Sequence, residues 1–101
     1  MALTHDASEI FRDMMRNDSK YRVAVLNEVL ECIANGEADI AKELLRDYVD
    51  AIGFDKLAKF MDTQSIKRML RPSVNPSLDS ISKLLASLRK CEGAGLRVHA
   101  E

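Results

Sequence analysis

The sequence of 101 residues has few of the side chains from which small catalytic and metal centres are built. Its two cysteines, Cys32 and Cys91, form no CxxC pair and have no close histidine, which argues against a zinc finger or a disulfide framework. Its two histidines, His5 and His99, lie near opposite ends, so a histidine-based active site lacks partners. We therefore expect a protein that is not an enzyme and uses no metal or cofactor.

The sequence also lacks long apolar runs. No stretch approaches the roughly 18 residues that a membrane helix needs, and the N-terminus has no signal-peptide apolar segment. With 47% hydrophobic and 31% charged residues, the composition is that of a globular chain rather than a disordered one. At this length one hydrophobic core is usual, so we expect a single cytoplasmic domain over residues 1–101 with no membrane partner.

Charge is divided unevenly along the chain, although the net charge is only −1. Residues 1–62 contain 8 Lys/Arg and 13 Asp/Glu, a net charge of −5, whereas residues 63–101 contain 7 and 3, a net charge of +4. Such asymmetry is typical of a protein with one face that meets a polyanion. The densest cationic stretch, residues 56–71, contains Lys56, Lys59, Lys67, Arg68 and Arg71. A solvated helix face explains this stretch as well as a functional patch does, so charge alone does not decide.

Glycine and proline are scarce, with four and two residues, and they mark the breaks in a helical pattern. Capping signals occur at Asp6 or Ser8, at Asn17-Asp18-Ser19, at Asp62-Thr63 and at Asn75 or Ser77. The alternation in Leu96–His99 is a weak indication of a strand. The predicted helices cover 8–16, 18–35, 37–52, 54–61, 64–71 and 78 to the glycine at 93. The chain is thus predicted to be all-α, with N-terminal helices over 1–52, a helix-turn-helix region over 53–92 and a tail over 93–101.

Two short helices, a tight connection, a polar loop and a longer helix are typical of a helix-turn-helix unit. In this interpretation Ala58 is the small residue where the two short helices cross, and Ile66, Met69 and Leu70 face the core. The outer edge of the second helix then carries amide and cationic side chains. Glutamine can read adenine and arginine can read guanine, while lysine and threonine hold phosphates. These outer residues are Thr63, Gln64, Lys67, Arg68 and Arg71.

Two segments resemble the HigA-type addiction-module antidote proteins. The first is Leu45–Phe54, LRDYVDAIGF, which continues into Leu57-Ala58. The second is Lys67–Pro76, KRMLRPSVNP, where the family typically has an Arg-Met-Leu and an Asn-Pro pair. These proteins are small bacterial antitoxins and transcriptional regulators with a lambda-repressor-like helix-turn-helix. The resemblance implies an all-α fold of five to six helices that binds DNA through the second helix of the motif.

The resemblance also implies which residues meet DNA. Thr63, Gln64 and Arg68 would face base edges, and Lys67, Arg71 and the Ser73–Asn75 loop would lie near phosphates. The connection departs from the family pattern, because residues 59–65 contain no glycine, and we expect a turn there that is shorter or built differently. The full candidate set is Lys56, Lys59, Thr63, Gln64, Ser65, Lys67, Arg68, Arg71, Ser73 and Asn75.

These observations predict a sequence-specific transcriptional regulator, the antitoxin of a type II toxin–antitoxin module that represses its own operon. One motif is small for tight selection of DNA, so we expect a homodimer on a two-fold operator. Dimer contacts are expected in the last helix and in Leu96–His99, and the acidic N-terminal helices would be left for a basic toxin. Two alternatives stay open. One is a helical protein–protein adaptor in which the helix-turn-helix is only a scaffold, and the other is a small enzyme subunit.

Overall fold

The computed structural model describes residues 3–93, and for residues 3–6 and 8 it describes the backbone alone. Over this range the chain forms six helices and no strand, which confirms the all-α prediction. The strand expected at Leu96–His99 lies outside the described residues. The helices are α1 (Leu3–Asn17), α2 (Ser19–Ala34), α3 (Ala38–Ile52), α4 (Phe54–Leu57), α5 (Thr63–Met69) and α6 (Leu78–Glu92).

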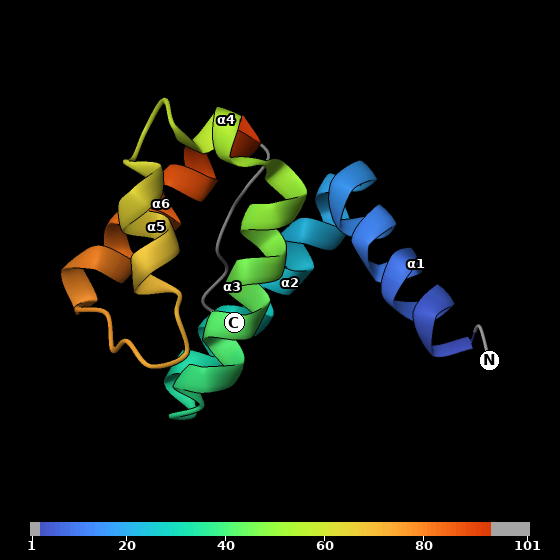
Figure 1. The fold of residues 1–101 in the computed structure, drawn as a ribbon, viewed down its shortest axis with the longest axis horizontal. Helices are drawn as coiled ribbons and strands as arrows, with labels where there is room; N and C mark the ends of the chain where they lie inside the picture. The colour runs from blue at the N-terminus through green and yellow to red at the C-terminus, as the bar shows by residue number, and fades with distance from the viewer. Residues whose placement is uncertain (1–2, 94–101) are drawn as a thin grey trace.

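Helix α3 lies at the centre of the molecule. It packs along α2, while α1 lies to one side of this pair and α4, α5 and α6 lie to the other (Figure 1). The radius of gyration is 13.5 Å, close to the value of about 13 Å for a folded domain of this length. The segment predicted to bind DNA therefore lies on the opposite side of α3 from α1.

The helix boundaries follow the capping residues that the sequence indicates. The Asp18 side chain accepts hydrogen bonds from the backbone N–H groups of Lys20 and Tyr21, at 3.0 and 3.2 Å, and so begins α2. The hydroxyl of Ser77 begins α6 in the same way. Gly53 joins α3 to α4 with φ at +93°, a backbone conformation that favours glycine. These predicted breaks are confirmed.

Two predicted boundaries are wrong. Helix α1 begins at Leu3, so Asp6 and Ser8 lie inside it rather than at its start. Neither glycine nor proline precedes them, and a capping residue type does not by itself end a helix on its N-terminal side. Helix α4 ends at Leu57 instead of continuing to residue 61. After Leu57 the chain forms a tighter turn, in which the N–H of Phe60 donates to the carbonyl of Leu57, three residues back, at 2.9 Å.

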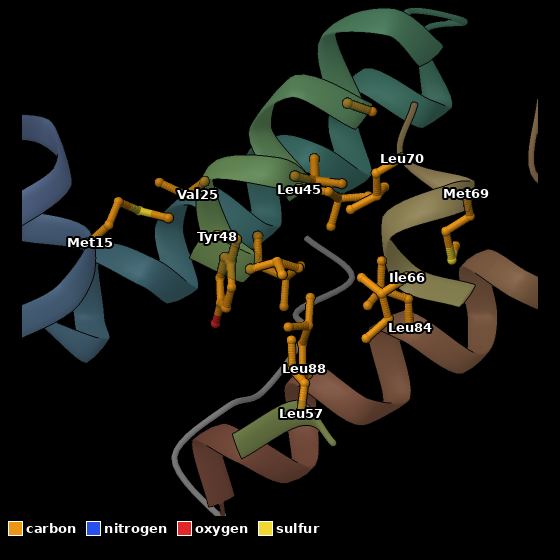
Figure 2. Packing of buried hydrophobic residues seen from close by; sticks show 14 of the residues in the cluster. Met15, Val25, Leu45, Tyr48, Leu57, Ile66, Met69, Leu70, Leu84 and Leu88 are labelled. Atoms are coloured by element: carbon orange, nitrogen blue, oxygen red, sulfur yellow. The ribbon is translucent and has the colours of Figure 1, made fainter. Parts of the chain in front are cut away.

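One core surrounds α3, with buried side chains of α2 and Met15 of α1 on one side and those of α4, α5 and α6 on the other. Leu45 and Tyr48 of α3 meet Leu57, Ile66 and side chains of α6, all of them fully buried (Figure 2). Several large apolar residues at helical spacing are exposed, because the apolar stripe of their helix is wider than its contact with the neighbouring helices. These are Ile10, Met14, Ile33, Ile40 and Leu78.

Candidate nucleic-acid interface

Helix α5 has one buried and one exposed edge, as its sequence predicts. Ile66 and Met69 are buried in the core, and Leu70 follows them there. Gln64 and Arg68 are exposed on the opposite edge, together with Lys67 and Arg71. The buried edge fixes the rotation of the helix, because turning it would expose its apolar side chains to water. The amide and cationic side chains are thereby kept at the surface.

The start of α5 is held by a short chain of hydrogen bonds. The carboxylate of Asp62 accepts from the backbone N–H of Ser65 at 3.1 Å and from its hydroxyl at 3.0 Å. Arg68 Nη2 then donates to the same hydroxyl at 3.4 Å. Ser65 and Thr63 are half-buried, whereas Arg68 is exposed. Asp62 therefore caps the helix, and Ser65, which donates both bonds to it, lies within hydrogen-bond distance of Arg68.

The candidate cations are divided between two places. Lys67 Nζ lies 4.9 Å from the centre of the Phe54 ring, a cation–π contact that joins α5 to α4. Lys56 and Lys59 are exposed on α4 and the following turn, near the C-terminal end of α6. Lys90 of α6 completes this second group, although it was not among the candidates.

Ala58 does not have the expected role. It is exposed, and the preceding residue, Leu57, is fully buried between the helices in its place. The reason is that α4 ends at Leu57, which leaves Ala58 in the turn outside the helix contact. The expectation that Ala58 lies at a helix crossing is wrong.

The structure contains a buried lysine that the sequence analysis did not identify. Lys42 of α3 is only 5% exposed, and its ammonium group donates hydrogen bonds to the carbonyls of Arg71, Pro72 and Val74. These three carbonyls belong to the loop after α5. A signal existed in the sequence, since Lys42 precedes Leu45 by three residues and so falls on the apolar stripe of α3.

Arg46, one turn after Lys42, holds the end of α5 itself. Its Nη1 donates to the carbonyl of Leu70, the residue that caps α5 at its C-terminus. Carbonyls at a helix C-terminus lack partners within the helix and carry partial negative charge, so they favour cations. Together the two α3 side chains fix the loop on which Ser73 and Asn75 are exposed.

A second buried ionic group lies away from this surface. Glu92, whose side chain is 4% exposed, accepts from Arg22 Nε at 2.6 Å and from the Tyr48 hydroxyl at 2.6 Å. Arg22 Nη1 also donates to the carbonyls of Met15 and Arg16, each at 2.9 Å. Burial, reinforced by the Glu92 carboxylate, raises the pKa of Tyr48. This group joins four helices and has a structural role.

Neither cysteine has the setting of a reactive thiol. Burial, followed by the charge of Glu92, raises the pKa of Cys91, although Lys56 and Lys59 oppose the effect. Burial and neighbouring glutamates raise the pKa of Cys32 as well. A raised pKa keeps a thiol protonated near neutral pH, whereas nucleophiles and metal ligands are thiolates.

Comparison with protein-family models, with curated proteins and with solved structures finds no match to this chain. In residues 3–93, no helix has the length and apolar character to cross a membrane.

Proposed function

We propose that this protein is a sequence-specific DNA-binding regulator whose helix α5 enters the major groove. The observation that carries the proposal is the exposed edge of α5, on which Gln64, Lys67 and Arg68 lie side by side while the opposite edge is buried. A helix of this kind can be inserted into a duplex without disturbing the core. Its side chains match base edges and phosphates in chemistry.

Each side chain has a defined task in this proposal. Gln64 reads adenine and Arg68 reads guanine, while Lys67 and Arg71 neutralise phosphates. The loop after α5 adds further phosphate contacts through exposed polar side chains. Lys42 and Arg46 hold the backbone of this loop and of the end of α5 from inside, which supports the position of the contacting groups.

We further propose that the regulator is the antitoxin of a type II toxin–antitoxin module that represses its own operon in the cytoplasm. The support is the resemblance of Leu45–Phe54 and Lys67–Pro76 to HigA-type antidote proteins. In keeping with it, α2, α3 and their connection expose acidic side chains on which a basic toxin could bind. These are Glu28, Glu31, Glu37, Asp39 and Glu43.

The test is a titration of the protein against a labelled duplex from the DNA upstream of its own reading frame, at two salt concentrations. We expect binding that weakens steeply with salt, because cations released from phosphates drive it. Gln64→Ala and Arg68→Ala should each cost about 1–3 kcal/mol against this duplex and relax the preference over unrelated DNA. Arg71→Ala should weaken binding to all sequences alike.

Lys20→Ala is the matched control, since it removes an exposed cation from α2 and should leave DNA binding unchanged. Absence of binding at low salt would contradict the regulator proposal and favour the protein–protein adaptor. If the wild type binds DNA without sequence preference, the proposed phosphate contacts would stand, but base reading by α5 would be excluded. A separate experiment tests the antitoxin role: this protein and the product of an adjacent reading frame are purified and their binding to each other is measured.

A further inference from the structure

One aromatic side chain of this protein is held at the surface. The chain has three phenylalanines and two tyrosines, all of them among the described residues, and of these Phe60 alone is exposed, at 44%. It lies in the turn after α4, where its N–H donates to the carbonyl of the fully buried Leu57. A single exposed apolar side chain is ordinary, so the role of Phe60 depends on what lies around it.

Three lysines lie around the Phe60 ring. Helix α4 packs beside the C-terminal end of α6 (Figure 1), which brings Lys56 and Lys59 near Cys91, the residue after Lys90. Lys90 Nζ itself lies 5.7 Å from the centre of the Phe60 ring. All three lysines are exposed, and within residues 3–93 none of them forms an ion pair.

The neighbouring carboxylates do not neutralise these lysines. Glu92 pairs with Arg22, and Asp62 accepts the hydrogen bonds that begin α5. Asp55, beside Lys56 in the sequence, is exposed, but so is the additional cation Arg89 beside Lys90. The surface around the ring therefore has an excess of positive charge, which favours an anionic ligand.

The combination of ring and cations indicates the class of ligand. A ring alone would suit any apolar partner and lysines alone any anion, whereas a nucleotide presents both a flat base and a phosphate. Proteins that bind single strands stack bases on exposed aromatic side chains and neutralise the phosphates with cations. In a duplex the base faces are covered by the neighbouring pairs, so the ring would have no partner there.

We infer that Phe60 and the three lysines Lys56, Lys59 and Lys90 form a binding surface for single-stranded nucleic acid. One base stacks on the Phe60 ring, and the adjoining phosphates lie against the lysines. The inference goes beyond the proposed function, because this surface includes none of the residues to which duplex recognition was assigned. It is tested with single strands, so the two proposals can fail separately.

The experiment is fluorescence anisotropy with a labelled oligothymidylate of about 10 nucleotides, a length that one single-strand site covers. An abasic strand of the same length keeps the phosphates and lacks the bases. We expect the wild type to bind the oligothymidylate at low salt about fivefold or more tighter than the abasic strand, because one base stacks on the ring. Phe60→Leu, which keeps an apolar side chain, should bind both strands equally, whereas Phe60→Trp should retain the difference.

The lysines have a separate readout. Lys56→Ala and Lys59→Ala should each weaken the binding of both strands and reduce its dependence on salt, because each removes a contact with a phosphate. Lys20→Ala is the matched control, since it removes an exposed cation from α2 and should change neither quantity.

Absence of oligothymidylate binding at low salt would overturn the inference. So would equal binding of the two strands by the wild type, because the lysines would then hold phosphates without a stacked base. A Phe60→Leu variant that is folded by circular dichroism and still distinguishes the strands would also exclude this surface. Tighter binding of an unrelated duplex of the same length would show that the surface does not select single strands.

Discussion

Tyr48 links the stability of the protein to alkaline pH through one buried hydroxyl. The side chain is fully buried, and its hydroxyl donates to Glu92 at 2.6 Å. Burial is the largest cause of a pKa raised above the ordinary value of about 10, followed by the hydrogen bond to Glu92 and then by the charge of Glu92. The folded state therefore retains a proton that the unfolded chain gives up as the pH passes 10.

The sign of the effect follows from this retention. The stabilisation is fully present below about pH 10 and is lost as the pH rises through the folded pKa, by up to about 1.4 kcal/mol per pH unit. Tyr48→Phe should lower the free energy of unfolding by about 1.5–3 kcal/mol at pH 7, the value of a hydrogen bond to a charged group. It should also reduce the alkaline slope, to which the raised pKa values of Cys32 and Cys91 contribute as well. Urea unfolding from pH 7 to 11 measures both. An unchanged slope in the variant would contradict the assignment to Tyr48.

At the scale of elements, α3 holds α5 in position. The buried edge of α5 packs on the core, and Lys42 and Arg46 bind the carbonyls at and after its C-terminus. The sequence predicted the inward and outward edges of α5 correctly. It did not predict the support, because the lysine and its carbonyl partners are about 30 residues apart and no local pattern links them.

Lys42→Met tests this support. We expect a loss of about 1–3 kcal/mol in the free energy of unfolding, because the variant leaves the loop carbonyls without their donor, and faster amide hydrogen exchange in residues 71–76. Lys83→Met is the matched control, since Lys83 is exposed and pairs with Asp79 on its own helix at 3.2 Å. Its effect should stay within about 0.5 kcal/mol. Equal effects of the two variants would rule out a special role for Lys42.

At the scale of the whole molecule, the Arg22–Glu92 pair joins α2 to α6, 70 residues apart in the sequence. It links α2 to the last residue of α6, and Arg22 also binds the carbonyls that end α1. Both side chains are largely removed from water, at 17% and 4% exposure. Removing one partner would leave a buried charge uncompensated.

Arg22→Met should therefore lower the free energy of unfolding by about 3–5 kcal/mol, a large share of the 5–15 kcal/mol typical of a domain. The double variant Arg22→Met/Glu92→Met should lose less than the sum of the two single variants, because it leaves no charge buried alone. Urea unfolding of the four proteins provides the comparison. Additive losses would show that the two side chains act independently.

The sequence by itself determined the features that depend on neighbours three or four residues away. Apolar periodicity and capping residues such as Asp18 and Asp62 placed most helices, the inner edge of α5 and its exposed amide and cationic edge. Only the tertiary structure decided that α1 turns Ile10 and Met14 to solvent, that Lys42 holds a distant loop and that Arg22 meets Glu92, 70 residues away. Those outcomes depend on which face of each helix is buried in the shared core. That choice is set by the packing of all the helices together rather than by any local pattern.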